Sequence, residues 1–261
     1  MELINELNVS IDAAIRAGEK IMEIYSGSIE VEYKENNTPL TLADREANDI
    51  IVDSLLKNFP KYSILSEEKK DTKDRLENDW CWIVDPLDGT KEFIKKNGEF
   101  TVNIALSYKH KSVLGVIYVP VTKELYYAVK GSGAYLKSEH LLNKLQVSNK
   151  KDDLILVASR SHTSKQLSKL IEENKNKFKE VKNAGSSLKG CLIAKGEADV
   201  YYRFGLTSEW DTAAMQCIVE EAGGIFKQLD SSDMLYNREN TLNEKGFYIV
   251  NNGKNIFNIQ E

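Results

Sequence analysis

The segment that most constrains the fold of this chain is an apolar run followed at once by two acids. Residues 80–84 read Trp-Cys-Trp-Ile-Val, and residues 85–90 read Asp-Pro-Leu-Asp-Gly-Thr. Five apolar residues in a row are typical of a strand buried on both faces. Because Pro86 has no backbone N–H, we expect the strand to end there and the chain to turn away. Asp85 and Asp88 would then lie together at the carboxyl end of a buried strand.

Oxygen donors at such a turn suit a magnesium ion. Mg²⁺ is bound by one or two carboxylates, with waters and substrate phosphate completing its octahedron. Gly89 and Thr90 add backbone N–H groups and a hydroxyl at a chain reversal, which can face an anion. The alternative is a polar turn in which Asp bonds to the backbone, and the Asp-x-x-Asp spacing alone favours that alternative.

Further acids stand at the ends of predicted elements: Glu67, Glu68, Asp44 and Asp211. The first two follow a strand-like segment at residues 63–65, where solvated loop acids are the simpler explanation. Asp44 and Asp211 each come three residues after a candidate helix cap, Thr41 or Ser208, in a pattern similar to a capping box. Taken singly, each acid favours the simpler structural role. Their combination with the Asp-Pro-Leu-Asp segment favours a metal cluster.

The periodicity of apolar residues predicts two differently organised halves. Up to about residue 145, helices over 3–25 and 41–59 accompany strand-like runs, which predicts helices packed on a mostly antiparallel sheet. The remainder alternates strands with helices at 164–174, 188–194 and 210–222, which is typical of an α/β layer. We expect two closely packed subdomains with a cleft between them. Residues 1–145 would carry most metal ligands, and residues 146–261 the substrate-recognition residues and the last ligand.

Composition excludes several classes of protein. The 40 acidic and 35 basic residues give a net charge of −5, which argues against a partner that is a nucleic-acid polymer. The longest uncharged stretch, residues 112–122, is too short to span a bilayer. The start Met-Glu-Leu lacks the features of a signal peptide, and the three cysteines are widely spaced. A reduced, cytoplasmic protein is expected, and peripheral association with the membrane remains open.

Residues 84–90 and 209–214 resemble the two signatures of a known superfamily of phosphatases. These are the lithium-sensitive, magnesium-dependent phosphomonoesterases, which include inositol monophosphatase and fructose-1,6-bisphosphatase. The resemblance covers nearly the whole chain. It implies an α/β (α+β) fold, the layered αβαβα sandwich of that superfamily, and the activity of a metal-dependent phosphoric monoester hydrolase.

The resemblance also implies roles for individual residues. Two or three Mg²⁺ ions would be held by five positions: Glu67, Asp85, the Leu87 carbonyl, Asp88 and Asp211. Asp44 and Thr90 match the pair that orients and deprotonates the attacking water, and Lys34 matches a lysine near that site. Bound metal can activate water, clamp phosphoryl oxygens and stabilise the leaving alkoxide.

The second half of the chain resembles the 3′(2′),5′-bisphosphate nucleotidase branch. The resemblance lies in residues 159–162 (Ser-Arg-Ser-His), 185–189 (Gly-Ser-Ser-Leu-Lys) and 202–205 (Tyr-Arg-Phe-Gly). It implies removal of the 3′-phosphate from adenosine 3′,5′-bisphosphate, a by-product of sulfate activation, to leave AMP. The substrate, a small-molecule nucleotide, would be bound by Gly89, Thr90, His162, Ser186, Lys189 and Arg203.

Each of these substrate residues has a simpler explanation. Ser186 is a natural N-cap for the helix at 188–194, although free amides at a helix start also bind phosphate. Lys189 is one of many lysines and could simply be exposed, and His162 lies in a polar, Ser-rich turn. Arg203, at the end of an apolar strand, is the better candidate for fork-like phosphate recognition.

Two other functions stay open at this level. One is the same catalytic centre acting on inositol monophosphate or another small sugar phosphate. The other is an inactive module that senses a nucleotide or phosphate. The sequence is compatible with a monomer or a homodimer.

Overall fold

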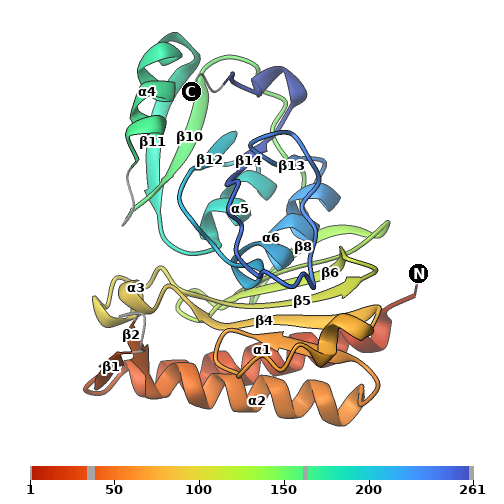
Figure 1. Ribbon diagram of the computed structural model, residues 1–261. Helices are drawn as coiled ribbons and strands as arrows, with labels where there is room; N and C mark the ends of the chain where they lie inside the picture. Colours follow the sequence, from red (N-terminus) through yellow and green to blue (C-terminus); the bar gives the residue numbers. More distant parts are fainter. Residues whose placement is uncertain (1, 34–38, 161–163, 259–261) are drawn as a thin grey trace.

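The chain forms five stacked layers of helices and sheets in the computed structural model, which describes residues 2–33, 39–160 and 164–258. From one side to the other they are a helix pair, a seven-stranded sheet, a second helix pair, a five-stranded sheet and a single helix (Figure 1). The αβαβα sandwich implied by the resemblance is therefore confirmed.

The first layer consists of α1 (Ile4–Tyr25) and α2 (Leu42–Asn58), which lie side by side against β4, β5 and β6. Apolar residues at helical spacing, such as Ala14, Ala17, Ile21 and Ile51, are fully buried against the sheet. Burying this stripe is what stabilises an amphipathic helix on a sheet. The short strands β1 (Val31–Tyr33) and β2 (Pro39–Thr41) pair antiparallel just before α2.

The large sheet follows the order of the chain and confirms the expected antiparallel arrangement. Its strands are β3 (Ser63–Ser66), β4 (Trp80–Asp88), β5 (Thr101–Tyr108), β6 (Lys111–Val119), β7 (Glu124–Val129), β8 (Gly133–Lys137) and β9 (Leu142–Lys144). Only the β3–β4 pairing is parallel among these neighbours. The short helices η1 (Asp74–Glu77) and α3 (Thr90–Ile94) flank β4.

The expectation that β4 ends at Pro86 is wrong. The strand continues to Asp88, which pairs with Thr101, whereas Asp85 pairs with Asn103. Two residues of β4, Pro86 and Leu87, therefore stand opposite one residue of β5. Such a bulge tolerates a proline inside a strand because its missing N–H is not required by the ladder there.

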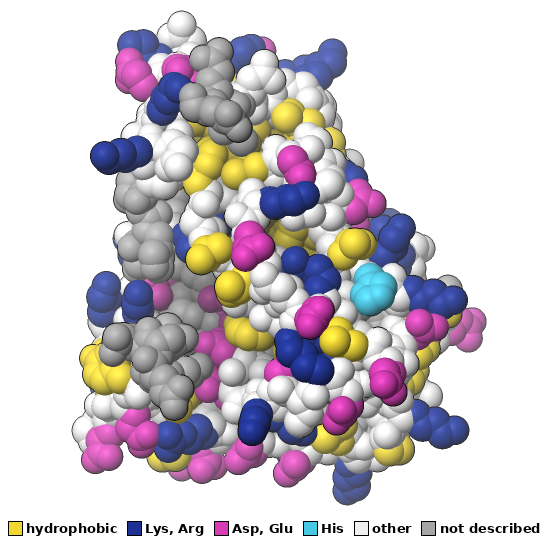
Figure 2. All heavy atoms as spheres, in the orientation of Figure 1, with side chains coloured by type: hydrophobic (Ala, Val, Ile, Leu, Met, Phe, Trp, Pro, Cys, Tyr) yellow, Lys and Arg dark blue, Asp and Glu magenta, His cyan; other side chains and the backbone are white. Residues whose placement is uncertain are grey.

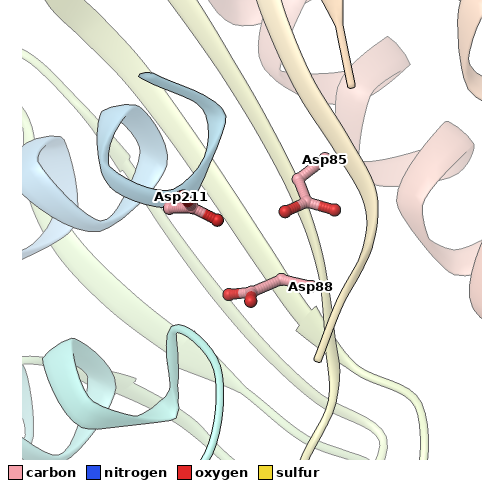
Figure 3. A group of neighbouring side chains, drawn as sticks. All are labelled: Asp85, Asp88 and Asp211. Atoms are coloured by element: carbon pink, nitrogen blue, oxygen red, sulfur yellow. The ribbon is translucent and has the colours of Figure 1, made fainter. Parts of the chain in front are cut away.

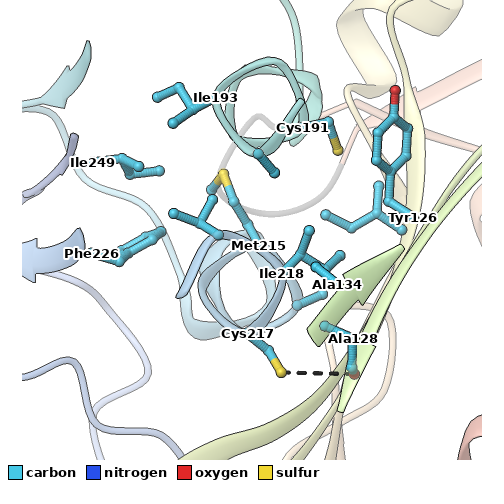
Figure 4. Close-up of a cluster of buried hydrophobic side chains, with 14 of the residues drawn as sticks. Tyr126, Ala128, Ala134, Cys191, Ile193, Met215, Cys217, Ile218, Phe226 and Ile249 are labelled. Carbon is cyan, nitrogen blue, oxygen red and sulfur yellow. Dashed lines mark hydrogen bonds between the residues drawn. The ribbon is translucent and has the colours of Figure 1, made fainter. Parts of the chain in front are cut away.

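The middle layer consists of α5 (Leu188–Ala194) and α6 (Glu209–Glu221) and lies between the two sheets. The contact between α6 and β6 is so close that a Cβ on Gly115 would lie 2.4 Å from the carbonyl oxygen of Ala214. Only glycine allows that approach. Around α6, side chains such as Met215, Ile218, Tyr126 and Phe226 form one core that draws on both sheets (Figure 4).

The second sheet has the order β11–β10–β12–β14–β13. Its strands are β10 (Leu154–Ser159), β11 (Phe178–Ala184), β12 (Val200–Arg203), β13 (Ile225–Gln228) and β14 (Phe247–Val250). Helix α4 (Lys165–Glu173) covers its outer face, and the short helices η2 (Lys175–Lys177) and η3 (Gly253–Asn255) complete the elements. The expected subdomain boundary at 145/146 falls between the last strand of one sheet and the first of the other.

Three further observations concern the chain as a whole. The cysteines Cys81, Cys191 and Cys217 are all buried and form no disulfide with one another. Among the described helices, none combines the length and the apolar character needed to cross a bilayer. The face seen in Figure 2 carries basic and acidic side chains interspersed rather than one basic field.

Candidate active site

A cleft of about 310 Å³ opens where the carboxyl end of β4 meets the first turn of α6 and the turn before α5. Residues from both sides of position 145 line it. They include Glu67, Asp85, Asp88, Gly89 and Thr90 from the first part of the chain, and Ser186, Lys189, Arg203 and Asp211 from the second. Most of the positions singled out in the sequence therefore share one cavity.

Three carboxylates converge at the floor of this cleft. Asp85 and Asp88 come from the bulged end of β4, and Asp211 comes from the first turn of α6 (Figure 3). One oxygen of each lies within 4.8 Å of the others. The bulge aids this geometry, since the Leu87 N–H donates to Oδ1 of Asp85 at 3.1 Å and fixes that carboxylate across the proline.

Burial and mutual repulsion make these acids reluctant to ionise. Burial raises the pKa of Asp211 from 3.8 to about 8, with the nearby charge of Asp88 adding to the rise. The pKa of Asp85 lies well above its usual value for the same reasons, with Glu67 as the largest charged contributor. Burial also raises the pKa of Asp88, and the ammonium of Lys189 partly offsets that rise. Carboxylates packed this tightly favour a cation between them.

Two residues that the sequence analysis missed hold Asp88 in place. The Ser187 hydroxyl donates to Oδ2 of Asp88 at 2.8 Å, and the Asn103 amide donates to the same oxygen at 3.2 Å. Thr101 in turn donates to Oδ1 of Asn103 at 2.9 Å. Ser187 stands inside the 185–189 segment, so a signal for it existed. Asn103 gave only the weak signal of a polar residue within an apolar strand.

Asp44 serves as a helix cap and as a site residue at once. Its Oδ2 accepts hydrogen bonds from the backbone N–H and the hydroxyl of Thr41, at 2.7 and 2.6 Å. Its Oδ1 accepts from the hydroxyl of Thr90 at 3.1 Å. The capping box at Thr41 is therefore confirmed, and the same carboxylate also holds Thr90, which lines the cleft. At the other predicted box, Oδ2 of Asp211 accepts from the backbone N–H of Ser208 at 2.5 Å.

The remaining predicted ligand positions line the same wall of the cleft. Glu67 lies beside β4, because its N–H donates to the carbonyl of Val84 at 3.1 Å. The carbonyl oxygen of Leu87 lies 3.4 Å from the Thr90 hydroxyl. Gly89 has a φ of +98°, and a Cβ there would lie 3.1 Å from the Glu99 carbonyl oxygen. This chain reversal therefore requires glycine.

Two cations, Lys189 and Arg203, also line the cleft and are called the cationic wall below. The simpler explanations for Lys189 and for Ser186 prove wrong. Lys189 is buried, not exposed, because it packs inside the cleft. Its ammonium donates to the Ser186 carbonyl at 2.6 Å and lies 5.4 Å from the ring centre of Tyr201, another residue that the sequence analysis missed. Burial lowers the pKa of Lys189 from 10.5 to about 8.

Ser186 does not cap α5, because the cap position belongs to Ser187. Ser186 instead adopts a left-handed backbone conformation, with a φ of +43°. Arg203 lies at the end of β12, and its Nη2 donates to the Leu206 carbonyl at 3.2 Å. Within the described part of the chain, the buried Nε of Arg203 and the hydroxyl of Ser186 have no hydrogen-bond partner. Both residues line the cleft.

Two predicted site residues, Lys34 and His162, lie outside the described residues.

The acidic floor fits a hard divalent cation. Its ligands are carboxylate oxygens from two elements, they lie within reach of one ion, and their pKa values are raised by burial and crowding. Oxygen-only sites of this kind suit Mg²⁺, Ca²⁺ or Mn²⁺.

Comparisons with known proteins find relatives over nearly the whole chain. The sequence matches the inositol monophosphatase family over residues 3–258. It is 40% identical over 241 residues to the 3′(2′),5′-bisphosphate nucleotidase CysQ of Salmonella typhimurium, which covers 91% of this chain and 96% of that protein. The protein of the same name from Buchnera aphidicola is 42% identical over 238 residues, covering 89% and 88%.

Solved structures show the same relationship. CysQ from Bacteroides thetaiotaomicron, a bacterial member of the inositol monophosphatase family, matches with a TM-score of 0.83 at 42% identity, covering 95% of this chain and 98% of that one. The IMPase of Thermotoga maritima matches with a TM-score of 0.80 at 27% identity, covering 95% and 92%. The family match extends over nearly the whole sequence, and the chain therefore belongs to the inositol monophosphatase family.

Proposed function

We propose that this protein is a Mg²⁺-dependent 3′(2′),5′-bisphosphate nucleotidase that converts adenosine 3′,5′-bisphosphate to AMP and phosphate. The observation that carries the proposal is that three converging carboxylates and the cations Lys189 and Arg203 line one cleft. The relatives named 3′(2′),5′-bisphosphate nucleotidase, at 40% and 42% identity, support the choice of substrate.

The acidic floor would hold the metal. Asp85, Asp88 and Asp211 are its central ligands in this proposal, with Glu67 and the Leu87 carbonyl at the rim. Bound Mg²⁺ would supply charge to the phosphoryl oxygens, the attacking water and the leaving alkoxide. The protein's task is then positioning and charge neutralisation, as in phosphoryl transfer generally. Ser187 and Asn103 contribute by fixing one oxygen of Asp88, so that the other stays toward the cluster.

Thr90 and Asp44 would handle the proton of the attacking water. The Thr90 hydroxyl donates to Oδ1 of Asp44, so its oxygen lone pairs remain free to accept a proton from water. Oδ2 of Asp44 is already engaged by Thr41, which orients Oδ1 toward Thr90. A base must lie within hydrogen-bond reach of the proton it abstracts, and Thr90, which lines the cleft, would meet that condition for a water bound at the acidic floor.

The cationic wall would bind the second phosphate. A bisphosphate that places one phosphate on the metals carries another negative charge that must be neutralised some distance away. Lys189 and Arg203 line the same cleft as the acids, and the guanidinium of Arg203 would donate to a phosphate oxygen. Arg is suited to such bidentate contacts. Gly89, Ser186 and His162 complete the proposed contacts.

The decisive experiment compares two substrates under metal control. We expect rapid phosphate release from adenosine 3′,5′-bisphosphate, much slower release from inositol 1-phosphate, loss of both on adding EDTA, and recovery with excess Mg²⁺. A preference for inositol 1-phosphate would favour the sugar-phosphatase alternative. Binding of the nucleotide without release of phosphate at saturating Mg²⁺ would favour the inactive sensor.

A further inference from the structure

A carboxylate outside the cleft connects the two sheets directly behind the cationic wall. Glu99, in the segment between α3 and β5, accepts two hydrogen bonds from the Arg160 guanidinium, at 2.6 and 2.7 Å. Its Oε2 also accepts the backbone N–H of Gly185 at 2.8 Å. The same guanidinium donates to the carbonyl of Asn183 at 3.0 Å. Glu99 thus ties the segment before β5 to the chain after β10 and to the chain after β11.

The contact with Gly185 is close as well as hydrogen-bonded. A Cβ on Gly185 would lie 2.7 Å from the carbonyl oxygen of Glu99 and 3.0 Å from its Cβ, so no larger residue fits. Neither Glu99 nor Arg160 lines the cleft, whereas Gly185 and Ser186 do. Glu99 therefore acts on the cleft only through the backbone of the turn.

Ser186, which follows Gly185 in this turn, has a backbone conformation that its surroundings must hold in place. Ser186 has a φ of +43°, a conformation that costs a non-glycine residue free energy and persists only where its surroundings hold it. On one side Glu99 holds the N–H of Gly185, and on the other Lys189 donates to the carbonyl of Ser186. The hydroxyl of Ser186, buried and without a described partner, is held at the cleft between these two anchors.

We propose that Glu99 is a positioning residue that sets specificity for substrates with two phosphates by holding the Gly185–Ser186 turn against the cationic wall. This inference rests on the proposed function for its choice of substrate. Glu99 holds the backbone N–H of Gly185, whereas the hydroxyl of Ser187 makes its own hydrogen bond to Asp88. Loss of Glu99 should therefore weaken binding of the distal phosphate more than it slows the chemical step.

A purely structural ion pair predicts a different result. The Glu99 and Arg160 side chains are 23% and 46% exposed, and pairs with this exposure contribute little to global stability. Glu124 provides a matched control. Its side chain is similarly exposed, at 26%, and it pairs with Lys195 across the same two parts of the molecule. Lys195 follows the last residue of α5 and so lies away from the Gly185–Ser186 turn. If an ion pair between these two parts of the molecule were all that mattered, substitution of Glu124 would change KM as much as substitution of Glu99.

The test compares Glu99→Ala, Glu99→Gln and Glu124→Ala in the full-length protein at saturating Mg²⁺. The kinetic readouts are kcat and KM for adenosine 3′,5′-bisphosphate and for adenosine 3′-monophosphate, which lacks the distal phosphate. A separate readout, amide hydrogen exchange at Gly185, needs no activity. We expect Glu99→Ala to raise KM for the bisphosphate about tenfold, as loss of one charge-assisted anchor would, with kcat changed less than about threefold.

The monophosphate should show less than about a twofold change, and the Gly185 amide should exchange about tenfold faster. Glu99→Gln, which keeps an acceptor oxygen, should recover part of both effects, and Glu124→Ala should show neither. Equal effects on the two substrates, equal effects of the Glu99 and Glu124 variants, or unchanged exchange at Gly185 would overturn the inference. If the wild type released no phosphate from the bisphosphate, the proposed function would fail, and the exchange measurement alone would still decide whether Glu99 holds the turn.

Discussion

Substitution of Asp88 by Asn should change the stability of this protein in opposite directions with and without metal. The substitution keeps the shape of the side chain, so an amide oxygen can still accept from Ser187 and Asn103. It removes one negative charge from the cluster with Asp85 and Asp211. Without metal, the charge of Asp88 repels the neighbouring carboxylates. With metal, the same carboxylate is a ligand.

The size of the effect follows from the geometry. Two unit charges 4.8 Å apart repel by about 3 kcal/mol at an effective dielectric constant of about 20. Because burial raises the pKa of Asp211 to about 8, that carboxyl is largely protonated at neutral pH, and only part of this repulsion operates. We therefore expect metal-free Asp88→Asn to be more stable than the wild type by about 1–3 kcal/mol at pH 8.

The dependence on pH has a definite sign. Carboxyls whose pKa is higher in the folded than in the unfolded protein bind protons more tightly when folded. Their contribution to stability is complete below about pH 4 and is lost as pH rises toward the value of about 8 for Asp211. The metal-free wild type should therefore lose stability between pH 4 and pH 8. Asp88→Asn should lose less, so the gap between the two should close at acidic pH.

Thermal and urea unfolding in EDTA and in Mg²⁺ would measure this. A ligand at one hundred times its dissociation constant stabilises the folded state by about 2.7 kcal/mol, and the wild type should gain that much while the variant gains little. Activity of the variant should fall at least tenfold at saturating Mg²⁺, which corresponds to about 1.4 kcal/mol of barrier.

The control is Asp199→Asn, which alters a buried aspartate outside the cleft that accepts the N–H of Ile155 at 2.7 Å. It should destabilise the protein equally with and without metal. A variant at Asp88 that is less stable than the wild type in EDTA, or that gains as much from Mg²⁺, would refute the ligand assignment.

Three further predictions concern the relay, the cationic wall and the packing of the middle layer. Asp44→Asn and Thr90→Ala should each lower kcat by about 100-fold and combine non-additively in the double variant, so additive effects on kcat would contradict the relay. Asp44→Asn should also lower the free energy of unfolding by about 1 kcal/mol, because it removes a helix cap. Arg203→Ala should lower kcat/KM about 10- to 100-fold for adenosine 3′,5′-bisphosphate and far less for adenosine 3′-monophosphate, and equal losses would exclude recognition of the distal phosphate. Gly115→Ala should lower the free energy of unfolding, measured in urea, by about 1–3 kcal/mol, because the new Cβ would meet the Ala214 carbonyl. An unchanged urea midpoint of unfolding would mean that α6 shifts freely.

The acidic site could be predicted from the sequence because its signals are local. An apolar run that ends in acids, and acids three residues after helix caps, both place side chains at element ends without knowledge of the tertiary structure. The structure brings Asp85, Asp88 and Asp211 to one cleft as expected, and Asp44 bonds to Thr90 at the edge of that cleft. The choice between capping and site chemistry at Asp44 could not be made locally. A carboxylate has two oxygens, and here each takes one of the two roles.

What the sequence by itself determined was the order of the elements, the mostly antiparallel sheet and the acids of the proposed metal site, because periodicity and chain-local spacing encode these directly. The tertiary structure alone decided which residues support them. It placed Ser187 and Asn103 on Asp88, buried Lys189, gave the cap of α5 to Ser187 rather than Ser186, and continued β4 through Pro86. The physical reason is common to all of these. Hydrogen-bond partners, strand pairing and burial depend on which segments meet in space, and spacing along the chain does not record a contact such as that between Asn103 and Ser187, which are 84 positions apart.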